Sequence, residues 1–265
     1  MSTIPAESEL LFHHISCIPS PDDFPRHMHG GYELLYFLRG DVDFAIEGAV
    51  YRLRERDLLL IAPRTYHCLL PRSSVEYERF VINFSEQLLP YQARQALADA
   101  SGLYHLPADH AIPRFYRSWQ DAEEIFTKEE LERLVRMGPE WILPFLYHLP
   151  RAEDARPVRR NRPLQSILRY IDEHPTEHPT AASLSAAFYV SPSWIVHTFR
   201  RELGINLTQY VARKRILYAQ SLIQSGEAPT SVAVTCGYES YVTFYRQYRR
   251  ILSHCPKDDL PRDEM

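Results

Sequence analysis

Three histidines and one glutamate near the beginning of the chain have the residue types and the spacing of a binding site. His27 and His29 lie two residues apart, Glu33 follows four residues after His29, and His67 ends the segment APRTYH. Three imidazoles and one carboxylate form a ligand set that suits iron, zinc, manganese or nickel. The same side chains could instead line a pocket for an organic molecule, or satisfy one another without binding anything. We favour the organic pocket, and we expect no metal and no other cofactor.

The region that must position these residues has the pattern of short strands separated by turns. In VDFAIEG (42–48) apolar residues alternate with acidic ones, and alternation with a period of two predicts a half-buried strand. Further strands are predicted at 51–54, 58–61 and 75–84, and such spacing predicts a sandwich or barrel within residues 1–85. The two neighbouring histidines would project from one face of a strand. The residues expected to bind an effector at the mouth of the barrel are His27, His29, Glu33, Tyr36 and His67.

Residues 86–149 are predicted to be helical, because apolar side chains recur there three and four residues apart, as at Leu131, Leu134 and Val135. Helices appended to a small barrel either cover it or pair with the same helices of a second chain. We favour the second arrangement and therefore expect a homodimer. The segment 150–163, PRAEDARPVRRNRP, has no apolar periodicity and is predicted to be an exposed linker between domains.

Residues 164–265 are predicted to be all helical and to contain one structural pattern twice. Ser191, followed by proline, predicts the start of a helix that is preceded by a short helix and a tight turn. This helix-turn-helix pattern spans about 182–203 and recurs at about 230–250, where Ser240 is predicted to cap the second helix. The helix between the two patterns has an apolar stripe at Ala212, Ile216, Ala219 and Ile223. Two such units could reach successive segments of the DNA major groove, about 34 Å apart.

The outward positions of the second helix in each pattern are the candidates for DNA contact. The residues expected to face base edges are Ser193, Val196, His197, Tyr241, Val242, Tyr245 and Arg246. The residues expected to contact phosphates are Arg200, Arg201, Arg249 and Arg250. An arginine can bind guanine through two hydrogen bonds, whereas phosphate contacts supply affinity without base choice. The two tyrosines could instead pack against their own domain.

Composition and charge are consistent with a soluble DNA-binding protein. Apolar residues make up 45% and charged residues 24% of the chain, as in globular proteins. The total charge of −4 divides into −9 for residues 1–155 and +5 for residues 156–265, which indicates a polyanion as the partner of the basic part. The chain has no run of 18 apolar residues and no secretion signal at its start, so we expect a cytoplasmic protein with no membrane partner. The scattered cysteines, predicted to be reduced thiols, are Cys17, Cys68, Cys236 and Cys255.

Residues 164–256 resemble the DNA-binding domain of the AraC/XylS family of bacterial transcription regulators. The matching residues are Ser191, Ile195, Phe199, Gly204, Arg215, Ala219, Ala233, Gly237, Tyr238, Phe244 and Pro256. The departures from the usual residues are Ser185 in place of alanine, Tyr189 and Ser253 in place of glycine, and Asp259 and Leu260 in place of an aromatic residue and arginine. The resemblance implies a preceding cupin-like barrel with helices that dimerise. The early histidines, with Glu33 and Gly40, also resemble the motifs of the cupin superfamily, whose metal-binding members hold one ion, although Arg64 stands where those members usually have glycine.

These observations predict an α+β protein, with an N-terminal cupin-like β-barrel and appended helices followed by an all-α domain with two helix-turn-helix motifs. The expected function is sequence-specific regulation of transcription on double-stranded DNA. A small-molecule effector, such as a sugar or a related metabolite, would control a homodimer that acts with RNA polymerase. We do not expect an enzyme. Two alternatives stay open: a metal-dependent cupin enzyme with an accessory helical domain, and a DNA-binding dimer without an effector.

Overall fold

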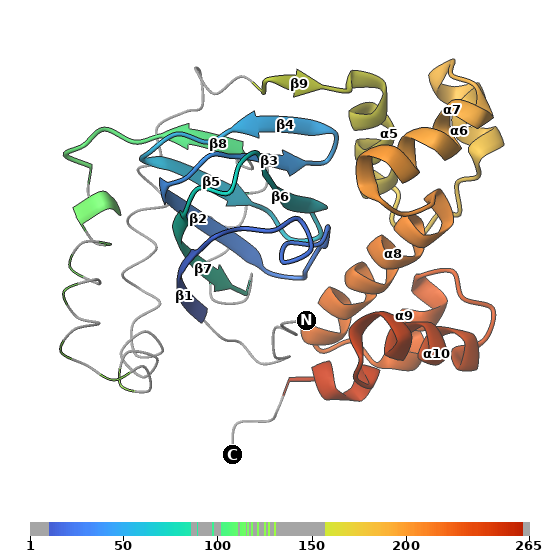
Figure 1. The fold of residues 1–265 in the computed structure, drawn as a ribbon. Helices are drawn as coiled ribbons and strands as arrows, with labels where there is room; N and C mark the ends of the chain where they lie inside the picture. The colour runs from blue at the N-terminus through green and yellow to red at the C-terminus, as the bar shows by residue number, and fades with distance from the viewer. Residues whose placement is uncertain are drawn as a thin grey trace. The chain divides into compact units, whose positions relative to one another are not determined.

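The chain divides near residues 159 and 160 into two compact units (Figure 1). The structure is a computed structural model that describes residues 11–85, 102–110 and 157–261, together with single positions between 86 and 130. The first unit is built on β-strands and the second on helices, which confirms the predicted α+β class. Most of the segment 86–149, where dimerising helices are expected, and the first half of the expected linker lie outside the described residues.

The first unit contains two sheets. The five-stranded sheet has the order β1 (Leu11–Cys17), β7 (Tyr77–Phe84), β2 (Tyr32–Arg39), β5 (Asp57–Ile61) and β8 (Gly102–His105). The four-stranded sheet has the order β6 (His67–Pro71), β3 (Val42–Ile46), β4 (Ala49–Arg52) and β9 (Arg159–Arg160). The strands from β1 to β8 pair antiparallel, as expected of a barrel made from consecutive short strands.

The central strand β2 buries both of its faces, and its alternating side chains enter two different apolar clusters. Leu35 and Phe37 belong to one cluster with Phe44 of the other sheet, so this cluster fills the space between the two sheets. Tyr36 points to the opposite face and belongs to a second cluster that includes Tyr116 from the segment after β8. Since successive side chains of a strand alternate, odd-numbered positions of β2 face the interior of the barrel.

Among the strands that were not predicted from the sequence are β1, β6, β8 and β9. The strand β9 lies in the segment that was predicted to be a linker, and β8 lies within the segment 86–149 that was predicted to be helical. A strand of only four residues, GLYH, is too short to show a period of two. Its position is determined by pairing with β5, in which Asp57 lies opposite His105. The sheet, and not a local pattern, therefore determines this strand.

The second unit consists of helices whose boundaries follow from local capping signals. Its elements are α5 (Arg162–Glu173), α6 (Ala181–Phe188), α7 (Pro192–Thr198), the π-helical η3 (Phe199–Leu203), α8 (Leu207–Gln224), α9 (Pro229–Thr235), α10 (Tyr241–Leu252) and the short 3-10 helix η4 (Pro256–Asp259). The Ser191 hydroxyl accepts a hydrogen bond from the Trp194 amide, and Gly204 ends η3 with a positive φ of 73°. Ser240 stands at the N-cap of α10 but makes no side-chain capping hydrogen bond, so the expected serine cap is present only at the first of the two helices.

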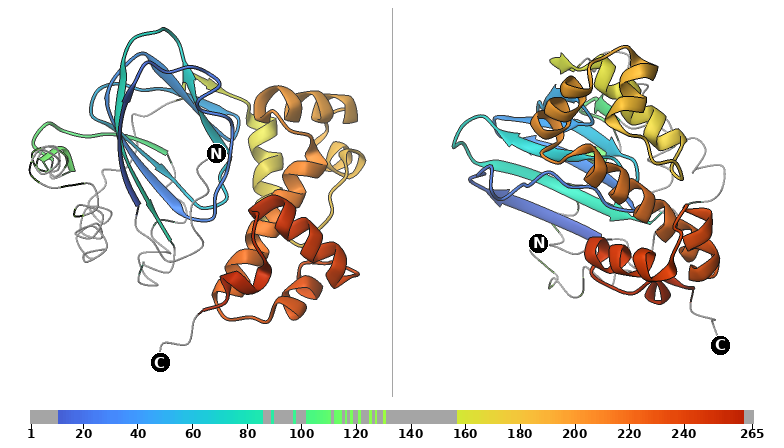
Figure 2. Two further views of the ribbon diagram at one scale, coloured as in Figure 1. Left: turned by 60° about the horizontal axis from the view of Figure 1, so that its bottom comes forward. Right: turned by 90° about the vertical axis from the view of Figure 1, so that its right-hand side faces the viewer.

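The long helix α8 forms the core of the second unit. Its predicted stripe of Ala212, Ile216, Ala219 and Ile223 is buried. Ile216 and Ile223 pack with Val232 of α9 and with Phe244 and Tyr248 of α10. Figures 1 and 2 show α6 and α7 at one end of α8 and α9 and α10 at the other. At 1.5 Å per residue, the 18 residues of α8 are about 27 Å long.

Two further predictions concern the whole chain. The described part of the chain contains no helix that is long and apolar enough to cross a membrane. All four cysteines are free, as predicted.

Candidate functional site

The outer surface of α7 presents a polar stripe, because its apolar residues face inward. Ile195 and Phe199 are fully buried. The residues exposed on the opposite side are Ser193, Val196, His197 and Arg200. Positions three and four residues apart share one face of a helix, so these four side chains form one continuous surface. All three residues that were predicted to face bases from the first motif lie on it.

The outer surface of α10 is more basic. Phe244 and Tyr248 face the core, and the exposed residues include Val242, Arg246, Arg249 and Arg250. The two tyrosines predicted to face bases are half-buried. The ring of Tyr241 lies 5.8 Å from that of Phe244, and the Tyr245 hydroxyl lies 3.2 Å from the Cys255 sulfur. Both tyrosines therefore pack partly against their own domain, and Val242 and Arg246 are more exposed than the two tyrosines among the residues predicted to face bases.

One predicted phosphate-binding residue already has a partner within the domain. The Arg201 guanidinium donates to the Glu202 carboxylate at 3.0 Å, and the Glu202 side chain is only 4% exposed. The Arg201 side chain is 65% exposed, so its outer face is open to solvent. Of the four arginines expected at phosphates, Arg201 is thus the one whose charge is partly neutralised.

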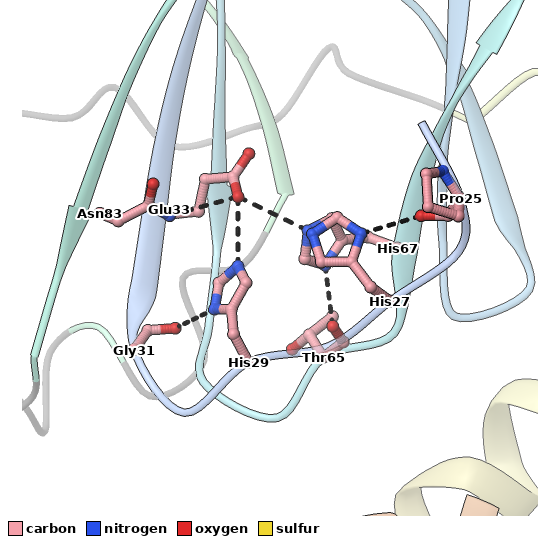
Figure 3. Close-up of polar contacts among 8 residues, drawn as sticks. All are labelled: Pro25, His27, His29, Gly31, Glu33, Thr65, His67 and Asn83. Carbon is pink, nitrogen blue, oxygen red and sulfur yellow. Dashed lines mark hydrogen bonds and ion pairs between the residues drawn. The ribbon is translucent and has the colours of Figure 1, made fainter. Parts of the chain in front are cut away.

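The second candidate site lies in the first unit, where the early histidines and the glutamate come together (Figure 3). One ligand atom from each of His27, His29, Glu33 and His67 lies within 4.8 Å of every other. Glu33 stands on β2 and His67 begins β6, so the two sheets each contribute a side chain. His27 and His29 were predicted to lie on a strand. They lie instead on the segment that precedes β2.

Hydrogen bonds and burial determine the charge of this cluster. The Glu33 carboxylate is 8% exposed, and its Oε2 lies 3.1 Å from His29 Nε2 and 3.6 Å from His67 Nε2. Burial alone would raise the pKa of Glu33, but the two neighbouring imidazoles outweigh it and hold that pKa well below its usual 4.5. The residue His27 as a whole is exposed, yet desolvation of its ring, with repulsion from His67, lowers its pKa to about 4. An ionised carboxylate thus faces the imidazoles near neutral pH.

The backbone fastens the two segments that carry the histidines. His27 and His67 form a β-bridge, with hydrogen bonds of 3.0 and 2.9 Å in the two directions. The amide of Arg64 donates to the carbonyl of His29 at 2.7 Å. Arg64 has a φ of 63°, so it adopts the left-handed conformation for which a glycine would be usual at this position. The departure at residue 64 therefore leaves the path of the backbone intact.

Tyr36 does not belong to this cluster, although it was predicted to bind the effector with the four other residues. Its ring stacks on that of Tyr116 at 4.8 Å, on the face of β2 opposite to Glu33. Residues 33 and 36 are an odd number of positions apart, so they must point to opposite faces of a strand. Asn83 was overlooked: it pairs with Glu33 in the sheet, and its amide donates to Glu33 Oε2 at 3.3 Å. A polar residue within the apolar run VINF was the signal that could have identified it.

Comparisons with known proteins match both units of the chain. A family model described as an AraC-like ligand binding domain matches residues 16–135, and a model described as a helix-turn-helix domain matches residues 184–260. The chain is 24% identical over 231 residues to the uncharacterized HTH-type transcriptional regulator YbfI of Bacillus subtilis, covering 81% of this chain and 79% of that protein. It is also 24% identical over 250 residues to the uncharacterized HTH-type transcriptional regulator YijO of Escherichia coli, covering 91% of this chain and 84% of that protein. Among solved structures, ToxT from Vibrio cholerae aligns with 94% of this chain and 96% of its own at 12% identity, with a TM-score of 0.39.

Proposed function

The chain belongs to the AraC/XylS family of transcription regulators, and on this basis we propose that it reads an asymmetric DNA site with α7 and α10 under the control of a molecule bound in its barrel. The regulator has a ligand-binding domain and a helix-turn-helix DNA-binding domain. The two helices would enter successive segments of the major groove of one duplex. An effector that binds one arrangement of barrel and DNA-binding domain more tightly than another would shift the population toward that arrangement.

The observation that carries this proposal is the exposure of two helix faces at the ends of one connecting helix. The outer faces of α7 and α10 are not covered by other described residues of their unit. The length of α8, about 27 Å, is comparable to the spacing of about 34 Å between successive major-groove segments. A rigid connection of this size supports simultaneous contact by both helices.

The proposed roles of the side chains follow from their exposure and chemistry. The residues proposed to face base edges are Ser193, Val196, His197, Tyr241, Val242, Tyr245 and Arg246. The residues proposed to hold phosphates are Arg200, Arg201, Arg249 and Arg250. Arg246 is placed one turn further along α10 than Val242, where an arginine can bind guanine O6 and N7 together. Val196 and Val242 could contact only a thymine methyl group.

The other proposed partners concern the barrel and the segment after it. His27, His29, Glu33 and His67 support the proposal of an effector site at one end of the barrel, because they are polar groups gathered in an otherwise apolar interior. We also propose that the segment 86–149 pairs with its counterpart in a second chain. The homodimer would act with RNA polymerase in the cytoplasm, as a regulator and not as an enzyme.

DNA binding by two matched variants tests the reading mechanism. Duplexes selected from a random pool serve as the specific sites, and a scrambled duplex as the non-specific one. Arg246→Ala should lose about 1–3 kcal/mol of preference for the selected site, since it removes a base contact. Arg250→Ala should weaken binding to both duplexes alike and lower the dependence of affinity on salt. Equal losses on the two duplexes for both variants would contradict the assignment of Arg246.

A further inference from the structure

The imidazoles of the histidine cluster are held with one particular nitrogen pointing inward. His27 Nδ1 lies 3.0 Å from the carbonyl of Pro25, His29 Nδ1 2.9 Å from that of Gly31, and His67 Nδ1 2.9 Å from that of Thr65. A carbonyl oxygen only accepts hydrogen bonds, so each Nδ1 must carry the proton. In a neutral ring the Nε2 atom then has a free electron pair. This orientation, with Nδ1 bonded to a backbone carbonyl, is the one that fixes histidines as metal ligands.

The inward nitrogens of two of these rings converge on a single carboxylate oxygen. His29 Nε2 and His67 Nε2 both point at Oε2 of Glu33, at 3.1 and 3.6 Å (Figure 3). His67 Nε2 is buried, with its side chain 1% exposed, and it makes no hydrogen bond to any residue that the structure describes. When the rings are neutral, electron pairs on two nitrogens and on a carboxylate oxygen repel one another, and a cation bound between them removes this repulsion. The buried, unsatisfied Nε2 atom of His67 therefore points to a ligand that this cluster would bind.

The distances suit a transition metal. Metal–nitrogen and metal–oxygen bonds are about 2.1 Å long, so two neighbouring ligands of one ion are about 3.0–3.4 Å apart. The separation of 3.1 Å between His29 Nε2 and Glu33 Oε2 falls within this range, and the separation of 3.6 Å between His67 Nε2 and Glu33 Oε2 exceeds it by about 0.2 Å. The largest separation in the cluster, 4.8 Å, exceeds by about 0.6 Å the distance of about 4.2 Å across a single ion, so a small inward rotation closes the set.

The surroundings of the cluster keep it assembled before any ion arrives. The bridge between His27 and His67 and the bond from Arg64 to His29 fix the two carrying segments. The Asn83 amide donates to Glu33 Oε2 and so orients the carboxylate. At Gly31, whose carbonyl orients His29, an added Cβ would lie 2.8 Å from the carbonyl oxygen of Phe84. Only glycine fits there without moving the histidine segment.

We infer that His27, His29, Glu33 and His67 bind one divalent transition-metal ion, and that this ion is the group through which the barrel takes up its effector. Three imidazole nitrogens and one carboxylate oxygen suit iron, nickel, cobalt or zinc, and not magnesium or calcium, which prefer oxygen ligands. Four protein ligands leave two positions of a six-coordinate ion open for a small molecule that binds through oxygen or nitrogen. The part of this inference that concerns the effector rests on the proposed function, whereas the metal site does not.

Metal binding to the full-length protein tests the inference directly. Protein freed of metal with a chelator is titrated with Co²⁺ and Zn²⁺ by calorimetry, and the visible absorption of Co²⁺ reports nitrogen coordination. We expect one ion per chain, and no comparable binding of Mg²⁺. Glu33→Gln and His67→Gln should each lower the metal affinity at least about tenfold. Asn83→Ala should lower it by about 10- to 100-fold, the range typical of residues that hydrogen-bond to a metal ligand.

A histidine outside the cluster provides the matched control. His105 Nδ1 lies 2.8 Å from Asp57 Oδ1, so His105→Gln also removes an imidazole–carboxylate contact of the same unit but should leave metal binding unchanged. Circular dichroism of the metal-free proteins checks that each variant is folded. The inference would be overturned if the wild type did not bind one ion per chain, or if Glu33→Gln and His67→Gln bound the metal as tightly as the wild type does. DNA binding is measured on the same preparations to keep the two questions separate. If the protein binds selected duplexes but no metal, the metal inference fails and the assignment as a regulator stands.

Discussion

Asp259 connects three elements of the helical unit and holds α10, the second helix that we propose to read DNA, in place. Its side chain has no exposed surface. Oδ2 accepts hydrogen bonds from the Tyr248 hydroxyl and from His254 Nε2, both at 2.5 Å, and Oδ1 accepts from the Gln220 and Gln224 amides at 3.0 and 3.1 Å. These partners belong to α10, to the turn that follows it and to α8. The carboxylate therefore fixes α10 against the connecting helix.

Replacing Asp259 by asparagine should loosen α10. Asparagine keeps the volume but turns one oxygen into an amide group, which cannot accept the hydrogen bonds that converge there. Each bond to a charged group contributes about 1.5–3 kcal/mol, so losing two acceptor contacts should cost roughly 3–6 kcal/mol. That is a large part of the total stability of a domain, which is about 5–15 kcal/mol.

Hydrogen exchange of the full-length protein, followed by mass spectrometry, measures this loss where it occurs. Since about 1.4 kcal/mol corresponds to a factor of ten, amide protection in Tyr241–Leu252 should fall by about two to four orders of magnitude. Affinity for a selected duplex should fall with it. Glu239→Gln is the matched control, because it removes one negative charge from an exposed residue of the same unit. Should Asp259→Asn change the protection of α10 by no more than this control does, the role assigned to the carboxylate is wrong.

Two further predictions concern the same unit. The hydrogen bond to Asp259 raises the pKa of His254 above its usual 6.5, so the pair stabilises the fold fully below pH 6.5 and loses this contribution as the pH rises through the raised pKa. The free energy of unfolding in urea should therefore fall over that pH interval more for the wild type than for His254→Gln. Parallel pH profiles of the two proteins would contradict the linkage. Tyr189 is 95% exposed and has a left-handed φ of 55°, a conformation that costs a side-chain residue about 1–2 kcal/mol. Tyr189→Gly should thus raise the unfolding free energy by up to about 1 kcal/mol after the larger chain entropy of glycine is subtracted, while Tyr189→Ala, which keeps the strain, should not.

Left-handed residues show why departures from a family pattern are hard to interpret from the sequence. Tyr189 and Ser253 were identified as departures from expected glycines, and both retain the backbone conformation that glycine would adopt, with φ of 55° and 67°. Asp259 was also a departure, and it is the centre of a buried hydrogen-bond network. At residues 189 and 253 the departure from glycine therefore leaves the left-handed backbone conformation intact.

The sequence by itself determined the features that depend on neighbours along the chain. The helix that begins after Ser191 and ends at Gly204, the buried stripe of α8 and the alternation of β3 could all be predicted, because capping and periodicity act over a few residues. The position of Tyr36 on the other face of β2 could have been deduced in the same way.

Only the tertiary structure decided which distant groups meet. The strand β8 exists because β5 pairs with it, and the Asp259 network joins residues that lie up to 39 positions apart. The inward turn of three imidazoles toward Glu33 depends on a bridge between His27 and His67, two segments 40 positions apart. Such contacts depend on strand register and on buried hydrogen bonds, and these are decided by the packing of the whole unit, which no short stretch of sequence records.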